Sequence, residues 1–176
     1  MGYNKLPVGK NPPHSISVMI EISGNSGPVK YEYDKDTEVM VVDRILKTPM
    51  HYPCHYGFVP HTLCDDGDPL DVLVLAPYTL LAGSLIECRP VGVMGMEDES
   101  GLDAKVIAVP VSKVCSDYDH VEDIQDIPES TLEKIHHFFE HYKDLDQGKW
   151  VKIGQLKGKE AALKEIEEAI SMANTN

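Results

Sequence analysis

Four aspartates lie within seven residues of a turn that also contains Gly67 and Pro69, and an apolar run, 72–75, follows directly. They are Asp65, Asp66, Asp68 and Asp71. Such a cluster repels itself unless a cation lies in it, and magnesium is typically held by one or two carboxylates together with water and substrate phosphates. Asp and Gly are also ordinary turn residues, so this segment alone supports a metal site and a plain acidic turn equally well. An EF-hand calcium loop is excluded, because position twelve counted from Asp66 is Pro77 and not Glu.

A second acidic group flanks the turn at residues 100–101. Its members are Glu97, Asp98, Glu99 and Asp103. A solvated loop would explain this acidity. However, Lys105 shares strand parity with Asp103, so an acid and a base should project from the same face of a sheet.

A similar arrangement of charge is expected in the first predicted hairpin. Glu21 on one strand faces Lys30 and Glu32 on the next. Alternating charge on an exposed strand is ordinary, and Arg44 and Lys143 each have a surface explanation as well. None of these residues identifies a site by itself.

The overall charge limits the choice of partners. The chain has 176 residues, with 29 Asp and Glu against 16 Lys and Arg, a net charge of -13 and a pI near 4.9. This balance argues against nucleic acid or an anionic membrane as the main partner, because both require a basic surface. An anionic substrate would need local cations to overcome the field.

Length and cysteine usage bound the class of protein. We expect one domain over residues 1–176, because a chain of this length can bury a hydrophobic core without needing disulfide bonds or a structural metal. The four cysteines form no CxxC pair, and neither a signal peptide nor a membrane-length apolar run is apparent, which predicts reduced thiols in the cytoplasm.

The first two thirds of the chain alternate short apolar runs with turn residues, a pattern typical of a small antiparallel β domain. The predicted strands are Ser15–Ile22, Lys30–Tyr33, Glu38–Val42, Val72–Leu75, Leu85–Met96 and Ala104–Val111. Turns at 23–28 and 97–102 are expected to close hairpins or nearly so.

The period changes after Asp126. Apolar residues from Leu132 to Leu145 recur at steps of three and four, which predicts an amphipathic helix, and Glu160–Met172 predicts a second. Strands first and helices last indicate an α+β fold with a barrel or strongly bent sheet.

At this point the residues resemble a known family, the family I soluble inorganic pyrophosphatases of bacterial type. The resemblance rests on the signature-like stretch 66–73, the preceding 56–60, the segment 30–33, the hairpin 98–105 and the helical stretch 138–143. It implies a mainly β member of the α+β class, an OB-like five-stranded β-barrel with two flanking α-helices. It also implies a cytoplasmic inorganic diphosphatase that assembles as a homohexamer.

The resemblance assigns metal ligands for several Mg²⁺ ions per subunit, with Mn²⁺ or Zn²⁺ as alternative ions. Asp66, Asp71 and Asp103 correspond to the tighter sites, Asp71 bridging two ions, and Asp98 and Glu21 correspond to ions that arrive with substrate. Water activated by these metals would be the nucleophile that converts pyrophosphate to two orthophosphates.

The remaining assignments concern the proton and the phosphates. Asp68 is similar to the general base of the family. Groups that would hold the two phosphates are Lys30, Arg44, Tyr56, Lys105, Tyr142 and Lys143. Glu32 and Glu99 would act through other side chains or water. The chemistry requires such a set, because the metals must convert an acidic pocket into one that binds a small polyanion.

The main rival is a zinc peptidase, because His137, Glu140 and His141 match HxxEH and two histidines four residues apart share a helix face. The motif is short, and a histidine-rich helix that packs on the body or on another subunit explains it better. In that case His136, His137 and His141 would titrate at a subunit contact.

A second rival is a noncatalytic OB-type module that binds oligonucleotides, which the acidic charge opposes. Residues 154–159 resemble a phosphate-binding loop only superficially, because the glycine spacing is one residue short and Glu160 stands where Ser or Thr would be required. We expect this segment to be the connection into the last helix.

Overall fold

The centre of the fold is a closed ring of five strands. In the computed structural model, which describes residues 2–175, these are β1 (Ile16–Ile22), β4 (His55–Phe58), β5 (Asp71–Val74), β8 (Lys105–Pro110) and β6 (Leu85–Asp98). They pair in that order, and β6 returns to pair with β1. Only the β5–β8 pair within this ring is parallel. Closure satisfies the sheet edges within the ring and brings the ends of distant strands to one rim.

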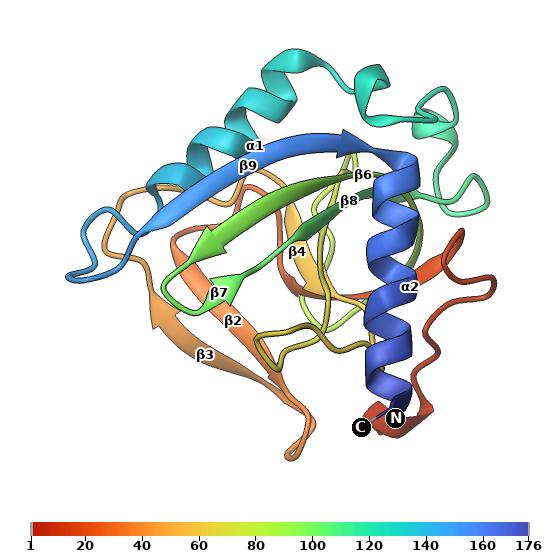
Figure 1. The fold of residues 1–176 in the computed structure, drawn as a ribbon, viewed down its shortest axis with the longest axis horizontal. Coiled ribbons are helices and arrows are strands. Elements are labelled where there is room, and N and C mark those ends of the chain that lie inside the picture. Colours follow the sequence, from red (N-terminus) through yellow and green to blue (C-terminus); the bar gives the residue numbers. More distant parts are fainter. Residues whose placement is uncertain (1, 176) are drawn as a thin grey trace.

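Three further pieces of β structure extend this barrel. The short β7 (Gly101–Leu102) and the long β9 (Val151–Gly158) both pair with β6. Strands β2 (Val29–Asp34) and β3 (Val39–Ile45) pair only with each other and form a separate ribbon, which lies beside the lower end of the barrel in Figure 1.

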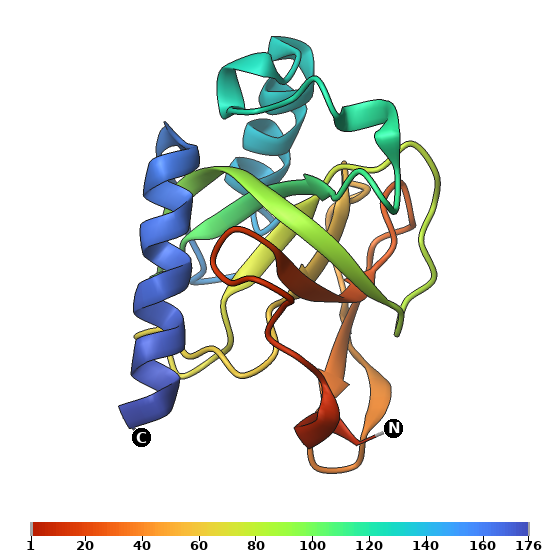
Figure 2. The ribbon, with the colours of Figure 1, turned by 90° about the vertical axis from the view of Figure 1, so that its right-hand side faces the viewer.

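Two α-helices cover the barrel, α1 (Glu129–His141) beside β9 and α2 (Lys159–Thr175) along β6. In Figure 2, α2 stands along one side of the barrel and α1 lies over its upper end. Three 3-10 turns complete the elements: η1 (Tyr3–Lys5), η2 (Ser116–Tyr118) and η3 (Ile124–Asp126).

The strands at the centre are buried on both faces. Leu73 and Ile107 face a cluster that includes Phe138 of α1, whereas the alternate residues Val72 and Val106 face a cluster that includes Ile166 of α2. This double burial explains why these strands are continuous apolar runs in the sequence. The predicted mainly β fold, an OB-like five-stranded barrel with two flanking helices, is confirmed.

The expected first hairpin is wrong. Strand β1 pairs with β4 and β6, and β2 pairs with β3. In place of a ladder partner, the backbone N–H of Tyr33 donates to Glu21 Oε1 at 2.7 Å. A side chain of β1 therefore accepts one backbone hydrogen bond from the edge of β2 that does not pair with β3. The second hairpin is confirmed by the pairing of Asp98 with Gly101.

Other corrections concern elements that lack a clear local pattern. Strand β4 was not predicted, and the expected connection at 154–159 lies mostly within β9. Leu145 lies beyond the end of α1 and is exposed. The prediction of a single domain over residues 1–176 stays a prediction.

Candidate active site

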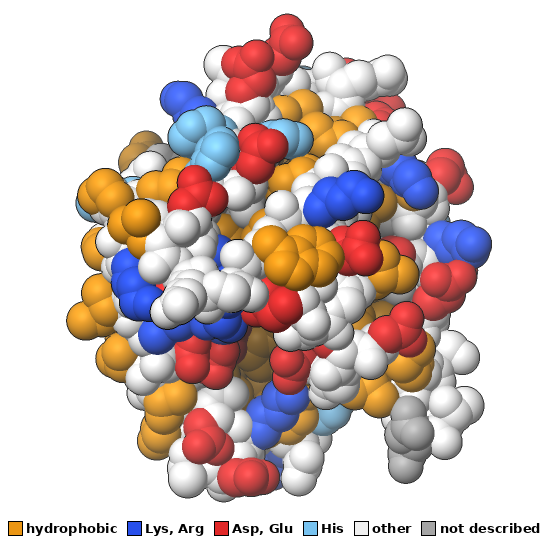
Figure 3. All heavy atoms as spheres, turned by 60° about the vertical axis from the view of Figure 1, so that its left-hand side comes forward, with side chains coloured by type: hydrophobic (Ala, Val, Ile, Leu, Met, Phe, Trp, Pro, Cys, Tyr) orange, Lys and Arg blue, Asp and Glu red, His pale blue; other side chains and the backbone are white. Residues whose placement is uncertain are grey.

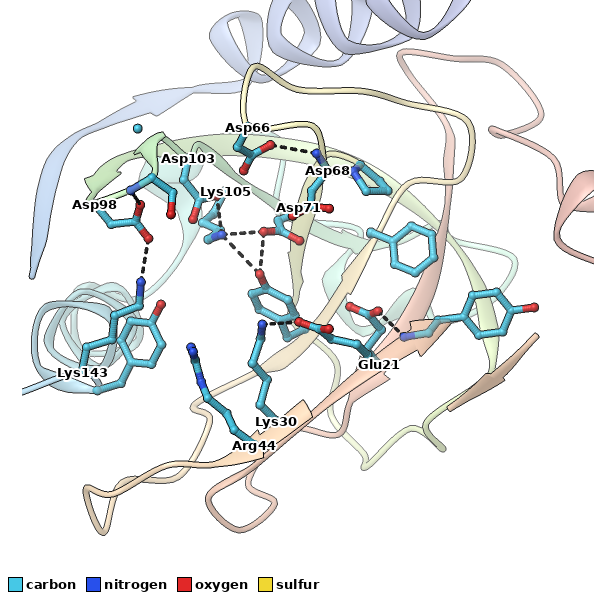
Figure 4. Close-up of a pocket in the computed structure, with 18 of the residues that line it drawn as sticks. Glu21, Lys30, Arg44, Asp66, Asp68, Asp71, Asp98, Asp103, Lys105 and Lys143 are labelled. Carbon is cyan, nitrogen blue, oxygen red and sulfur yellow. Dashed lines mark hydrogen bonds and ion pairs between the residues drawn. The ribbon is translucent and has the colours of Figure 1, made fainter. Parts of the chain in front are cut away.

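One cavity of about 560 Å³ collects every residue that the sequence predicted for the site. Figure 3 shows a hollow ringed by acidic and basic side chains, and Figure 4 shows ten of them pointing into it. The predicted residues that line it are Glu21, Lys30, Glu32, Arg44, Tyr56, Asp66, Asp68, Asp71, Asp98, Glu99, Asp103, Lys105, Tyr142 and Lys143. Their individual roles stay predictions.

The barrel wall of the cavity is built around Lys105. Strands β5 and β8 pair Asp71 directly with Lys105. The buried ammonium nitrogen lies 2.5 Å from Asp71 Oδ2, 2.5 Å from Asp103 Oδ1 and 3.2 Å from the Tyr56 hydroxyl, and that hydroxyl donates to Asp71 Oδ2 at 2.5 Å. Burial opposes the charge on Lys105, but the two carboxylates outweigh it and raise the pKa of the ammonium group. A positive charge is therefore fixed between two predicted metal ligands.

The positive charge around the carboxylates of this wall is too small to neutralise them. Burial, and then neighbouring acids, raise the pKa of Asp66 and of Asp103, although Lys105 opposes the shift. Burial similarly raises the pKa of Glu21 to about 8, with Asp71 and Glu32 adding to the effect. Nine carboxylates and only six Lys or Arg side chains line the cavity. The cavity therefore favours additional cations.

The loop that carries Asp66 and Asp68 is fixed by its own backbone. Asp66 Oδ1 accepts from the Asp68 N–H at 3.0 Å, and the Cys64 N–H donates to the Asp68 carbonyl at 2.8 Å. Between the two aspartates, Gly67 has a φ of +90°, which side-chain-bearing residues rarely adopt. The turn thus presents both carboxylates to the cavity, as the sequence predicted for this segment.

A second wall joins the β6–β7 hairpin to the segment after α1. The buried Lys143 donates to Asp98 Oδ2 at 2.6 Å and lies 3.6 Å from Glu99 Oε1. Burial opposes ionisation of Asp98, but hydrogen bonds from Lys143 and from the Ser100 N–H lower the pKa of this carboxyl. Lys149 Nζ lies 3.0 Å from Glu99 Oε1.

The ribbon forms the third wall and supplies cations that are less firmly paired. Lys30 contacts Glu32 and lies 3.5 Å from Asp43 Oδ2. The Nε atom of Arg44 lies 3.8 Å from the same oxygen, too far for a hydrogen bond. Within residues 2–175 it is one of only two buried side-chain polar atoms without a hydrogen-bond partner. An unsatisfied buried donor of this kind suits an incoming anion.

Sequence reasoning missed lining residues such as Lys149, and it missed Tyr52, which packs against the lining residue Tyr56. Lys149 lines the cavity, but it follows a turn without a helical or strand pattern. Tyr52 is almost fully buried, and its ring packs against Tyr56 and Phe138 at centroid distances of 6.0 and 4.6 Å. Burial raises its pKa, so Tyr52 stays neutral. Its place four residues before Tyr56 was the only available signal.

The HxxEH motif lies elsewhere. On the last turns of α1, Glu140 contacts His136 and His141, and the rings of His137 and His141 are 4.7 Å apart. These histidines do not line the described cavity. The HxxEH motif therefore lies outside the cavity, which argues against the zinc peptidase alternative.

The donor set fits magnesium. No group of three or more His, Cys, Asp or Glu side chains within the described chain forms a metal cage of its own. Magnesium does not require one, because it usually keeps several waters and takes one or two carboxylates plus substrate phosphates. Asp66, Asp71 and Asp103 provide carboxylates at one end of the cavity, and Arg44, Lys30 and Lys143 provide cations opposite them.

Fold and site together describe an OB-like barrel whose rim holds a cavity lined by carboxylates on one side and by Lys and Arg side chains on the other. The model of the inorganic pyrophosphatase family matches residues 18–174. An inorganic pyrophosphatase of Vibrio vulnificus is 53% identical over 173 residues, which cover 98% of each chain. The chain belongs to this family, and the predicted enzyme class, inorganic diphosphatase, is confirmed.

Solved structures agree with this assignment. The inorganic pyrophosphatase of Thermus thermophilus superposes with a TM-score of 0.93 and 45% identity, covering 99% of both chains. A structure described as an inorganic phosphatase of Anaplasma phagocytophilum gives a TM-score of 0.95 and 46% identity, covering 97% of this chain and 99% of its own.

Proposed function

We propose that this protein hydrolyses inorganic pyrophosphate to two orthophosphates at the cavity described above, with several Mg²⁺ ions and with Asp68 as the general base. The observation that supports this most directly is the opposition of two charge sets across one cavity. Carboxylates on the barrel wall face cations on the ribbon and on the segment after α1.

The metal-binding residues would be Asp66, Asp71 and Asp103, with Asp98 and Glu21 serving ions that enter with the substrate. When bound, magnesium supplies positive charge that neutralises the polyanion and makes a neighbouring water a stronger acid. Burial, and then neighbouring acids, raise the pKa of Asp66 and of Asp103, and a bound cation would favour the ionised form that both effects oppose. Mn²⁺ or Zn²⁺ would be alternative ions for the same oxygen ligands.

The phosphates would be held by Arg44, Lys30 and Lys143, with hydroxyls from Tyr56 and Tyr142. Arg44 has its Nε without a hydrogen-bond partner in the described structure, so a phosphate oxygen would satisfy it. Lys105 is already bonded to two carboxylates. It would therefore act by lowering negative charge where the phosphate lies, and Glu32 and Glu99 would orient Lys30 and Lys143.

Asp68 suits a role in proton transfer. Its backbone is fixed by the Asp66 carboxylate and the Cys64 amide, whereas the residue itself is exposed to the cavity. A carboxylate on a fixed backbone that faces water can accept a proton from the attacking water and hand it on.

The test is phosphate release from pyrophosphate. We expect fast release with Mg²⁺, none with EDTA, and much slower release from ATP; a peptide substrate with zinc should be untouched. If metal-dependent release from pyrophosphate is absent, the proposal is wrong. The same assay discriminates the peptidase and the noncatalytic module from a pyrophosphatase.

The setting of the enzyme is also part of the proposal. Within residues 2–175 no helix is long and apolar enough to cross a membrane. We propose a cytoplasmic homohexamer without nucleic-acid partners, supported by the acidic charge and by exposed apolar side chains such as Tyr78 and Leu81. Native mass spectrometry should give six times the chain mass, and a monomer would contradict the assembly without touching the catalytic proposal.

A further inference from the structure

His55 is a buried titratable side chain that the proposed chemistry does not use. It is the first residue of β4, only 3% of its surface is exposed, and it lies between two loops. The Gly24 N–H donates to its Nδ1 at 2.8 Å, and its Nε2 lies 3.0 Å from the Tyr78 carbonyl oxygen. Both ring nitrogens are therefore engaged by backbone groups.

These two contacts require one form of the ring. A nitrogen that accepts from an N–H must carry a lone pair, and a nitrogen that faces a carbonyl must carry a hydrogen. His55 is thus the neutral tautomer with hydrogen on Nε2. Protonation would place a hydrogen on Nδ1 against the Gly24 N–H and would leave a buried cation with one acceptor in place of two bonds.

The turn that His55 contacts is bonded tightly to the segment before β4. The Asn25 N–H donates to the Tyr52 carbonyl at 2.8 Å, and Asn25 takes up a φ of +58° there. A Cβ on Gly24 would lie 3.0 Å from the carbonyl carbon of Cys54 and 3.1 Å from the His55 nitrogen. The turn therefore packs closely against the backbone of residues 52–55.

This segment carries Tyr56, which lines the cavity, and Tyr52, which packs against it. Tyr56 directly follows His55, and its side chain leaves the opposite face of β4 to meet Asp71 and Lys105. Tyr52 packs its ring against Tyr56. The described β4 has only four residues, so the bonds at His55 fix the start of a short strand whose second residue reaches the cavity.

We propose that His55 is a positioning residue, and that its neutral ring, held between Gly24 and Tyr78, sets the place of Tyr56 in the cavity. The inference rests on the proposed role of Tyr56 in holding phosphate. Loss of either bond would loosen the start of β4 and would weaken pyrophosphate binding more than turnover.

The surroundings of His55 make this link sensitive to acid. Burial lowers the pKa of His55, although the bond to the Tyr78 carbonyl opposes the shift. Other titratable groups around the same cavity of about 320 Å³ are Cys54, Tyr118 and His120. Burial raises the pKa of Cys54 to about 12 and also raises that of Tyr118, so both side chains stay neutral over the pH range of the experiment described below.

The sign of the effect follows from the lowered pKa. Between the folded and the unfolded pKa of His55, the unfolded chain binds more protons, so folding stability rises with pH. The contribution is complete above the ordinary histidine value of about 6.5 and declines as pH falls through the lower folded value. The link should therefore hold at pH 7 and fail in acid.

The experiment is a double-mutant cycle on the full-length enzyme with magnesium. At pH 8, we expect His55→Gln to raise the KM for pyrophosphate about tenfold with a kcat change of less than about twofold, and Tyr56→Phe to have an effect of similar size. In the Tyr56→Phe background, His55→Gln should change KM by less than about twofold, because the hydroxyl to be positioned is gone.

The pH dependence gives an independent readout. The ratio of kcat/KM between the parent and His55→Gln cancels the titration of pyrophosphate and of the metals. This ratio should fall towards one as pH decreases from 8 to 5, whereas His120→Gln, the matched control with an exposed histidine on the same cavity, should follow the parent. His55→Asn, which can still accept from Gly24, should lie between the parent and His55→Gln.

The outcomes separate the two proposals. No effect of Tyr56→Phe alone would remove the assumed role of Tyr56. Additive effects in the cycle, or a ratio that does not change with pH, would overturn the positioning role of His55. If His55→Gln does not fold, as judged by circular dichroism, His55→Asn takes its place in both arms.

Discussion

The barrel wall and the ribbon of the candidate site hold their charges in different ways. On the barrel wall, Lys105 is buried, lies on strand β8, which is paired on both sides, and contacts two carboxylates at 2.5 Å. On the ribbon, Lys30 and Arg44 keep 23% and 32% of their side-chain surface exposed, and Arg44 has one buried nitrogen without a hydrogen-bond partner in the described structure. The cation of the barrel wall is therefore already paired with carboxylates of the protein, whereas the cations of the ribbon are not fully paired.

The difference has a physical reason. A charge in the barrel wall must be neutralised during folding, because burying it unpaired is costly. A charge on the two-stranded ribbon keeps part of its side chain in contact with solvent, so partial hydration stabilises it before a ligand binds. The barrel wall is thus expected to couple activity to stability, whereas the ribbon is expected to affect binding alone.

The largest effect is expected for Asp68→Asn, at the edge of the barrel wall. The amide keeps the size of the side chain but cannot accept the proton, so kcat should fall by about 10²- to 10⁴-fold. Calorimetric titration with Mg²⁺ should show metal binding retained, because Asp66, Asp71 and Asp103 are intact. Full turnover in this variant would remove Asp68 from the role of base.

Next in size is Lys105→Met, which tests whether the barrel wall joins activity to stability. Removing the ammonium leaves Asp71 and Asp103 without their shared partner, so the free energy of unfolding should fall by about 3 kcal/mol in the absence of metal. Urea unfolding with and without Mg²⁺ measures this, and bound metal should restore part of the loss. A free energy of unfolding equal to that of the parent would show that the contacts of Lys105 with Asp71 and Asp103 do not stabilise the fold.

The contrasting change is Arg44→Gln on the ribbon. The KM for pyrophosphate should rise about 10- to 100-fold, because a charged donor to phosphate is lost. The free energy of unfolding should change by less than about 0.5 kcal/mol, because the described Arg44 makes no hydrogen bond through its Nε. A stability loss as large as that of Lys105→Met would abolish the distinction between the two walls.

The smallest effect is expected for Lys149→Gln, which removes a part-exposed ion pair to Glu99. Such pairs contribute about 0–1 kcal/mol, so activity should change by less than about threefold. Steady-state kinetics at low and high salt measure it, with Lys164→Gln on the exposed face of α2 as the matched control. A loss beyond tenfold would place Lys149 among the phosphate-binding groups.

The parts of the fold with strong local patterns could be predicted from the sequence. Continuous apolar runs indicated β5 and β8, and the spacing of Ile135 and Phe138 indicated α1. Strand β4 could not be predicted, because His55, Tyr56 and Gly57 have no alternation and the strand is defined by its partners β1 and β5. The first hairpin failed for a similar reason, since a glutamate side chain took the place of a backbone partner.

For the site, the sequence by itself determined which side chains are available for the chemistry. Its spacing of Asp66, Asp68 and Asp71 on a Gly/Pro turn is local, and local chemistry is encoded within a few residues. Only the tertiary structure decided which of these charges meet. Lys105 reaches Asp71 because a parallel strand pair brings residues 34 positions apart into register, and Lys143 reaches Asp98 across 45 positions. Such contacts depend on barrel closure, which no short segment of the chain specifies.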